Sequence, residues 1–494
     1  MSVIDPTVPH VQAPRRALAT GILIFAAFMD LIDVTIVNVA LPSIREDLDA
    51  TPAHLEWVLS GYTLTFAVLL ITGGRLGDNV GRRTMFLLGV GGFSLASLGA
   101  CLSTNGDMLV VARVVQGGFA AMMVPQMLSS VQVLYPPRER AAVFGVVGAV
   151  SGTAAVIGPL LGGWLITHDA FGIGWRSIFL INIPVGLVIL VLAWMFVPNT
   201  SSATAKQVDL PGVLLASAAL FLLVFPLIEG HSQDWSARIW LMLAGSAVLM
   251  VLFVAVERRT EQRTGSSLLP MHLFANRGFS AGLVTQSVFQ GSLAGFSLVT
   301  IIYVQAGLGF SAFHAGLMLL PFSIGAFAGT GVSVPLGLKV GKTVCLAGAL
   351  LQAVGVWWVA RIIQDVGDDL TFWSLALPML LAGIGLGLLV VPLVDIALAT
   401  VPETEAGAAS GTYGTFQQVG AALGIAVIGS VFFGAISSFT PAALRDADIT
   451  ASWWVLGGFL VCAVSTVFLP DREAVQEHAR AQAELVGQGA GDDR

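Results

Sequence analysis

The stretch GRLGDNVGRR, residues 74–83, separates two apolar runs of membrane-spanning length, at about residues 53–73 and 84–103. A membrane helix needs about 20 mostly apolar residues to cross a hydrocarbon core roughly 30 Å thick. Three glycines in the stretch permit a tight turn, and its arginines favour the water layer on the inner side of a membrane. The stretch therefore predicts a short inner loop that joins two membrane helices.

The composition extends this prediction to the rest of the chain. Hydrophobic residues make up 56% of the 494 residues and charged residues only 11%, whereas an average soluble domain is roughly 25% charged. The net charge of −7 comes largely from predicted loops and the C-terminal tail, so the chain offers no basic face for nucleic acid. We expect an all-α protein that crosses the lipid bilayer many times and binds no nucleic acid.

Apolar length and the punctuation by Gly, Pro and charged residues predict fourteen membrane helices. Their approximate ranges are 17–41, 53–73, 84–103, 108–134, 142–167, 175–197, 209–228, 237–256, 279–304, 313–335, 343–362, 373–399, 408–434 and 452–469. The segments on the N-terminal side of the membrane hold 17 of the 23 Lys and Arg residues. Because cytoplasmic loops carry an excess of these residues, both termini are expected to be cytoplasmic.

An internal repeat divides the chain. LGDNVGRR, residues 76–83, resembles LGLKVGKT, residues 336–343, and both follow a predicted span that returns to the inner side. Spans one to six thus resemble spans nine to fourteen, with spans seven and eight inserted between them. The predicted units are a cytoplasmic tail 1–16, a six-helix bundle 17–197, a linker with two inserted helices 198–278, a second six-helix bundle 279–469 and a cytoplasmic tail 470–494. Many secondary transporters alternate access between two such halves.

Four motifs resemble the major facilitator superfamily, in particular its fourteen-helix drug:proton antiporter branch. GRLGDNVGRR matches the pattern G-x-L-x-D-x-x-G-R-R, and RVVQGG, residues 113–118, matches R-x-x-Q-G-x. IDVTIVNVALP, residues 32–42, matches the first span of the antiporter branch, and GTAAVIGPLLGG, residues 152–163, matches a pattern typical of antiporters. The resemblance covers roughly residues 17–470 and implies a major facilitator fold in a 6+2+6 arrangement.

The resemblance implies that the first motif is a latch, which holds the two halves together on the cytoplasmic side in the outward-facing state. Its residues are Gly74, Asp78, Gly81, Arg82 and Arg83. Asp78 is placed to cap a helix or to pair with an arginine of the same motif. The alternative is an ordinary positively charged inner loop.

Two carboxylates lie where hydrocarbon is expected. Asp30 and Asp33 are one helical turn apart in the first span, and Arg113 lies within the fourth. An unpaired arginine there costs about 2.5 kcal/mol or more, so it needs a carboxylate or a water-filled cavity. Burial disfavours a charged carboxylate and a guanidinium favours it, so we expect Asp33, Asp30 and Arg113 to face one cavity and to couple transport to protons. The family match favours Asp33 as the primary carrier. The alternative is a static ion pair that fixes helix packing.

The antiporter motif in the fifth span is interpreted as a hinge. Gly158, Gly162 and Gly163 permit close approach of neighbouring helices, and Pro159 interrupts the backbone hydrogen bonds of the helix. Ala154 departs from the family pattern, which usually has glycine there. The alternative is ordinary helix packing through glycine.

Amide, methionine and phenylalanine side chains in the predicted spans suit a pocket for varied lipophilic ligands. The candidates are Asn38, Gln116, Met122, Gln126, Gln286, Phe289, Gln290, Phe416 and Gln417. The seven histidines fall in loops, tails or span ends, so histidine is not expected to carry the proton. The three cysteines lack the spacing of metal ligands, and no metal site is expected.

Together with these features, the resemblance to the antiporter branch implies a secondary transporter that exports hydrophobic small molecules, such as drugs or antibiotics, in exchange for protons, by alternating access. Two aspartates against one arginine favour cationic or neutral substrates. No cofactor is expected, because GLKVGKT, residues 337–343, is one residue short of a nucleotide-binding loop. The alternative function is a dedicated exporter of one metabolite, lipid or self-made antibiotic. We expect a non-enzymatic monomer in the cytoplasmic membrane of a bacterium.

Overall fold

The chain folds into a bundle of helices. The computed structural model describes residues 13–135, 137–201, 209–230, 233–264, 268–399, 401, 406–436 and 440–471. Within these ranges there are no strands, and 13 helices are long and apolar enough to cross a membrane. Most of the predicted tails, at 1–12 and 472–494, lies outside the described residues, as does part of the linker, at 202–208.

The predicted count of fourteen spans is not confirmed. The difference is α5, Pro137–Thr167, which is 31 residues long. In this helix the side chains are described without a gap only over Ile157–Thr167, a stretch shorter than a membrane span. The predicted cytoplasmic location of both termini is not tested by the arrangement of the helices.

The helices form two groups and an inserted pair. The N-terminal group is α1 Ala13–Leu48, α2 Pro52–Val80, α3 Arg82–Cys101, α4 Gly106–Leu134, α5 Pro137–Thr167, α6 Ser177–Leu180 and α7 Asn182–Phe196. The inserted pair is α8 Leu210–Glu229 and α9 Ala237–Thr264. The C-terminal group is α10 Arg277–Ile302, α11 Ala312–Met318, α12 Leu320–Val340, α13 Thr343–Val366, α14 Phe372–Leu398, α15 Ala406–Ala435 and α16 Pro441–Ser465, with a π-turn at Tyr303–Gly307 after α10.

Local sequence sets several helix boundaries. Thr51 and His54 form a reciprocal cap at the start of α2, and Asn105 accepts a hydrogen bond from the backbone at the start of α4. Gly81, between α2 and α3, has φ 110°, and Gly341, between α12 and α13, has φ 59°. Glycine adopts these angles without strain. The two glycines occupy equivalent places in the sequence repeat, so the repeat corresponds to two similar helix corners.

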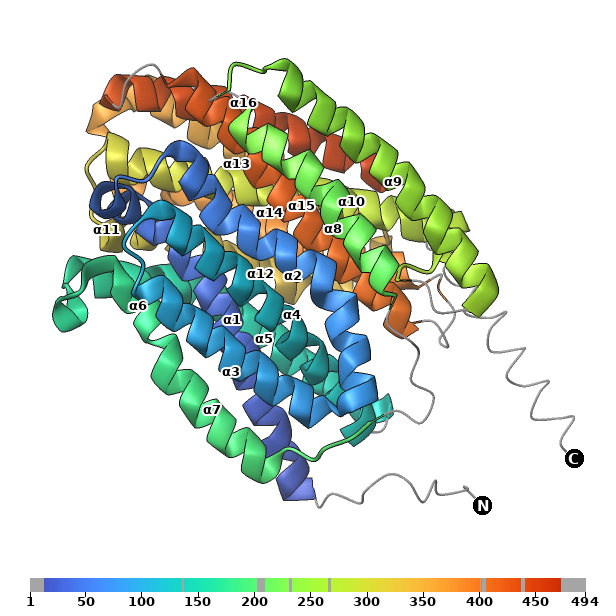
Figure 1. The fold of residues 1–494 in the computed structure, drawn as a ribbon. Coiled ribbons are helices and arrows are strands. Elements are labelled where there is room, and N and C mark those ends of the chain that lie inside the picture. The colour runs from blue at the N-terminus through green and yellow to red at the C-terminus, as the bar shows by residue number, and fades with distance from the viewer. Residues whose placement is uncertain are drawn as a thin grey trace, which may run out of the picture.

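The two groups meet along α2 and α15, and we call this contact the α2–α15 joint. The proximal end of the bundle is the end at which α2 meets α3, and the distal end is the end at which α1 meets α2. Leu70 lies against Gly414 in the proximal part of the joint, and Glu56 lies against Gly429 in the distal part. Figure 1 shows α8 running along this joint, with α9 on its outer side.

Further contacts join the groups at the distal end. Gln305 after α10 donates a hydrogen bond of 2.9 Å to the carbonyl of Val39 on α1. The backbone nitrogen of Phe313 on α11 donates over 3.2 Å to the hydroxyl of Thr167 at the end of α5. The described structure is therefore closed between the two groups at its distal end.

Glycines set how closely α10 and α15 cross inside the C-terminal group. A Cβ atom on Gly291 of α10 would lie 2.7 Å from the carbonyl oxygen of Gly420 on α15 and 3.3 Å from the Cα atom of Gly424. Any larger residue at position 291 must push the two backbones apart.

We predict that Gly291→Ala lowers the free energy of unfolding by about 1–3 kcal/mol, because the added methyl group overpacks the crossing. The measurement is the apparent melting temperature of the detergent-purified protein. Gly457→Ala on α16 is the matched control, because a Cβ atom there meets nothing within 4 Å. Equal melting temperatures for the two variants would contradict the close crossing.

Candidate functional site

A buried ion pair lies at the centre of the N-terminal group. The Oδ2 atom of Asp33 on α1 is 2.5 Å from the Nη1 atom of Arg113 on α4, and the exposed fractions of the two side chains are 0% and 1%. A pair removed from water is stable only if its geometry is close and its remaining hydrogen-bonding groups are satisfied. The surrounding residues supply those hydrogen bonds.

Two amides and a hydroxyl group complete the surroundings of Asp33. Its Oδ1 atom accepts hydrogen bonds from Gln116 Nε2 over 2.9 Å and from Asn182 Nδ2 over 2.7 Å. Arg113 Nη1 also donates to Gln116 Oε1 over 2.6 Å. Both amides donate to the hydroxyl of Ser97, on α3. Asp33 is thus held by side chains from α4 and α7, which α3 supports.

Asp30, one turn earlier on α1, has a different environment. Its carboxylate accepts a hydrogen bond from the hydroxyl of Tyr62 on α2, and its exposed fraction is 6%. The ring of Tyr62 lies against Arg113, whose Cζ atom is 4.3 Å from the ring centroid. Arg113 Nε donates to the carbonyl of Val58 over 3.1 Å. Tyr62 therefore links Asp30 to the ion pair.

We call these groups the carboxylate network. Its members are Asp30, Asp33, Tyr62, Ser97, Arg113, Gln116 and Asn182. The sequence predicted that Asp30, Asp33 and Arg113 lie together, but it missed the roles of Tyr62, Ser97 and Asn182. Polar residues inside apolar spans are the signal that would have found them. The expected exposure to a cavity is not met in this conformation, because Asp33 and Arg113 are buried within one group.

The predicted lining residues are spread over both groups. Gln126 donates to the carbonyl of Gly73, and Gln286 accepts from the hydroxyl of Tyr413 over 2.7 Å. Phe289 packs against Phe459 inside the C-terminal group. With Gln116, these side chains are buried inside their own groups. The remaining predicted lining residues are partly buried: Asn38, Met122, Gln290, Phe416 and Gln417.

The predicted latch contacts the N-terminal group and the segment that follows α7. Arg82 binds Asp78 with 2.6 Å between Nη2 and Oδ1, and its backbone nitrogen donates to the carbonyl of Thr200 over 2.8 Å. Gly74 packs near Pro125 of α4. Arg83 lies over the ring of Trp194 on α7, 5.5 Å from its centroid. In this conformation the motif therefore organises one corner of the N-terminal group.

The predicted hinge motif lies between α1 and the C-terminal group. A Cβ atom on Gly158 or Gly162 would collide with Thr35 or Ile36 of α1. A Cβ atom on Gly163 would lie 2.5 Å from the carbonyl oxygen of Ala312 on α11.

On the other side of this contact, a Cβ atom on Gly316 would lie 2.6 Å from the carbonyl of Pro159. The motif thus allows α5 to pack closely against both groups.

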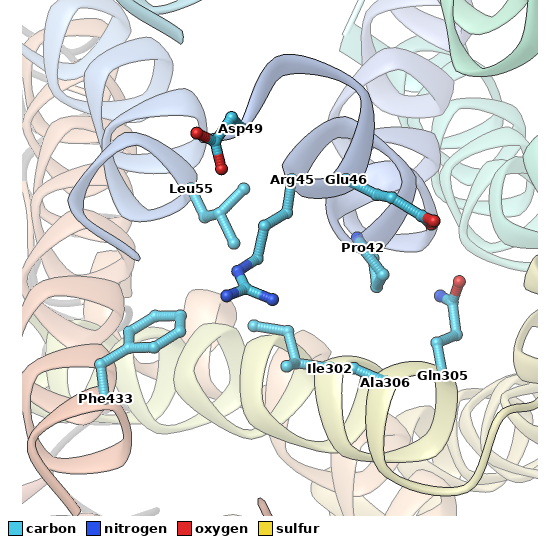
Figure 2. Close-up of a pocket in the computed structure, with 9 residues that line it drawn as sticks. All are labelled: Pro42, Arg45, Glu46, Asp49, Leu55, Ile302, Gln305, Ala306 and Phe433. Atoms are coloured by element: carbon cyan, nitrogen blue, oxygen red, sulfur yellow. The ribbon is translucent and has the colours of Figure 1, made fainter. Parts of the chain in front are cut away.

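A cavity of about 440 Å³ lies at the distal end, between α1 and α2 of one group and α10 and α15 of the other. Figure 2 shows the side chain of Arg45 reaching from the end of α1 toward Ile302 of α10. The lining residues are Pro42, Arg45, Glu46, Asp49, Leu55, Ile302, Gln305, Ala306 and Phe433. None of these is a predicted lining residue. The described residues contain no group of three or more His, Cys, Asp or Glu that could hold a metal ion.

Comparison with known proteins identifies the family. Residues 23–425 match the Major Facilitator Superfamily. The chain belongs to the major facilitator superfamily. Among its relatives, a protein described as a probable actinorhodin transporter of Streptomyces coelicolor is 41% identical over 434 residues, which are 87% of this chain and 75% of the relative.

Other relatives of this major facilitator protein are also named for antibiotics. The tetracenomycin C resistance and export protein of Streptomyces glaucescens is 34% identical, over 88% of this chain and 78% of the relative. A puromycin resistance protein of Streptomyces alboniger is 33% identical, over 95% of this chain and 94% of the relative. These relatives are transport and resistance proteins, as expected for the drug-efflux branch, and they indicate a multi-pass protein of the bacterial cell membrane.

Solved structures support the fold. A bacterial homologue of the human lysosomal transporter Spinster, in an inward-facing and unoccupied conformation, has a TM-score of 0.67 at 15% identity, covering 95% of this chain and 99% of the other. The nucleoside transporter NupG has a TM-score of 0.63 at 11% identity, covering 92% and 99%. At these identities the likeness concerns the fold alone.

We predict that Arg113→Met destabilises the protein by about 3–5 kcal/mol, because it leaves the charge of Asp33 buried without its cation. The double variant Asp33→Asn/Arg113→Met is expected to recover most of this loss, because neither charge remains. Melting temperatures of the purified proteins measure the difference. A double variant no more stable than Arg113→Met would show that the uncompensated charge is not the cause.

Proposed function

We propose that this protein exports lipophilic small molecules, antibiotics among them, in exchange for protons, by alternating access between its N-terminal and C-terminal groups. The observation that carries the proposal is the carboxylate network, in which two carboxyl groups and one guanidinium group lie inside an apolar bundle. Such residues are costly in a membrane protein and mark ion or proton pathways. The relatives named for antibiotic export or resistance support the substrate class.

In this proposal fourteen helices cross the membrane, and the proximal end of the bundle faces the cytoplasm. The length of α5, 31 residues, is sufficient for the remaining span. The described residues near the proximal end include Arg75, Arg82 and Lys342, which agrees with the excess of positive charge expected on the cytoplasmic side. The predicted bundles 17–197 and 279–469 are then the two moving units, with the inserted pair beside the α2–α15 joint.

Asp33, Asp30 and Arg113 form the proton-coupling site, and within it we assign proton binding to Asp30. Protonating Asp33 would disrupt an ion pair and two amide hydrogen bonds. Protonating Asp30 disturbs one hydrogen bond, from a tyrosine hydroxyl that can also act as an acceptor. Rotation of the Tyr62 side chain would then change how its ring packs against Arg113. This change would relay the protonation state of Asp30 to the ion pair.

The proposed cycle follows from these roles. With the distal end open, a proton from outside binds Asp30 and the substrate leaves. With the proximal end open, the proton leaves to the cytoplasm and the carboxylate favours a new cationic or neutral substrate. One charge moved through 100 mV supplies about 2.3 kcal/mol, enough for a roughly fifty-fold concentration gradient. No cofactor takes part, and one chain contains all the groups that the cycle uses.

Two of the predicted motifs have roles in this cycle. The latch, from Gly74 to Arg83, would meet the C-terminal group when the proximal end closes. The hinge, from Gly158 to Gly163, would release α11 when the distal end opens. The five partly buried candidates, Asn38, Met122, Gln290, Phe416 and Gln417, remain proposed contacts for the substrate.

A second candidate function is the dedicated export of one self-made antibiotic. The relative described as a probable actinorhodin transporter, 41% identical to this chain, favours it. The two functions differ in breadth, because a dedicated exporter would not move unrelated lipophilic cations.

We predict proton-driven uptake of a fluorescent lipophilic cation into everted membrane vesicles that contain the protein. Asp30→Asn and Asp33→Asn at equal expression should reduce gradient-driven uptake at least tenfold, because neither can complete the proton cycle. Asp446→Asn is the matched control, since Asp446 is an exposed carboxylate on α16. Full uptake by both network variants would contradict proton coupling at this site. Absence of uptake by the wild type would favour the dedicated exporter.

A further inference from the structure

Another buried carboxylate, outside the carboxylate network, lies at the α2–α15 joint. Glu56 is in the second turn of α2 and has an exposed fraction of 1%. Its Oε2 atom has no hydrogen-bond partner among the described residues. The same atom would lie 2.6 Å from a Cβ atom on Gly429 of α15. The carboxylate of one group is therefore pressed against the backbone of the other.

Among the described residues of the surrounding helices, no cationic side chain pairs with Glu56. No Asp, Glu, Lys, Arg or His occurs in α15. The inserted helix α8 presents a like charge, Glu229. On α4, Arg113 pairs with Asp33.

The remaining charged groups nearby are also engaged elsewhere. Asp107 of α4 interacts with His54 at the start of α2. On α1, Arg45 extends toward the distal cavity and interacts with Asp49. Glu56 thus faces glycine and one other carboxylate.

This environment links proton binding to closure of the joint. An ionised carboxylate without a partner in a buried contact costs several kcal/mol, and a like charge nearby adds to the cost. When α2 and α15 separate at the distal end, water can solvate the same carboxylate. A group that binds a proton more strongly in one conformation must favour that conformation when it is protonated.

The distal cavity is lined by neighbours of Glu56 and of Gly429. Leu55, the residue before Glu56, lines the cavity from α2, and Phe433, one turn after Gly429, lines it from α15. Figure 2 shows both side chains on the same side of the cavity. When α2 and α15 separate there, Glu56 would therefore meet water from the distal side.

We propose that Glu56 is a second proton-binding site, which must be protonated for the distal end to close. The proton binds from the distal solution when α2 and α15 are apart, stays on the carboxyl group while the joint is closed, and returns to the distal solution when it opens. Glu56 therefore makes closure depend on the distal pH without adding to the protons carried across the membrane. This inference concerns the gate and does not require that Asp30 couples transport.

The test measures opening at the distal end by pulsed electron paramagnetic resonance in lipid nanodiscs. Spin labels replace Thr104, between α3 and α4, and Asp369, between α13 and α14, two exposed positions in different groups. The native cysteines are replaced by serine. For the wild type, we expect the short-distance population to grow at least fivefold between pH 8.5 and pH 5.5.

In the Glu56→Gln variant the short-distance population should be large at both pH 8.5 and pH 5.5, because the glutamine side chain is neutral at both. Asp448→Asn is the matched control. Asp448 is a fully buried carboxylate on α16, a helix that is not one of the two that form the joint, and this variant should titrate like the wild type. Glu229→Gln should move the midpoint of the pH-dependent change in distance to lower pH, because an ionised Glu56 is then repelled less. It also keeps the test informative if Glu56→Gln folds poorly.

Two results would overturn the inference: a Glu56→Gln variant that titrates like the wild type, or a folded wild type whose distal distance does not change with pH. Asp30→Asn separates the gate from the proposed function, since it should keep the wild-type titration. Loss of gradient-driven uptake with an intact Glu56 titration would leave the gate standing. A failed titration with intact gradient-driven uptake would contradict the gate alone.

Discussion

The N-terminal group depends on the neutralisation of charge inside an apolar bundle. Arg113 is almost fully buried, and it is stable there because Asp33 lies within ion-pairing distance. The pair in turn requires an amide from Gln116 and another from Asn182, the first residue of α7. The positions of α1, α4 and α7 are therefore tied to the satisfaction of one carboxylate.

The helix contacts fall into two kinds with different consequences for movement. Inside the C-terminal group, Gly291 and Gly424 allow α10 and α15 to touch through their backbones, and such a contact has no room to slide. Between the groups, Gly163 and Gly316 allow equally close contact of α5 with α11, but a few hydrogen bonds and one unpartnered carboxylate, Glu56, accompany it. The second kind of contact is the one that alternating access would have to open.

The sequence predicted the helical class, the two similar groups and the inserted pair, because apolar length and repeated glycines carry that information. It also brought Asp33 and Arg113 together, because an arginine inside hydrocarbon needs a carboxylate. It could not predict that Gln116 and Gln126 bind inside their own group, because helical periodicity does not say which neighbour a buried amide meets. Glu56 was missed because it lies near the start of a span, where a charged residue is common and does not by itself indicate a buried site.

In the proposed exchange, binding of the substrate displaces the proton from Asp30 of the carboxylate network. The most direct measurement adds tetraphenylphosphonium to the purified, weakly buffered protein and follows proton release with a pH indicator. The account predicts that the wild type releases protons in proportion to the bound cation, and that Asp30→Asn releases none. Saturable binding to the wild type without proton release between pH 6 and pH 8 would contradict it.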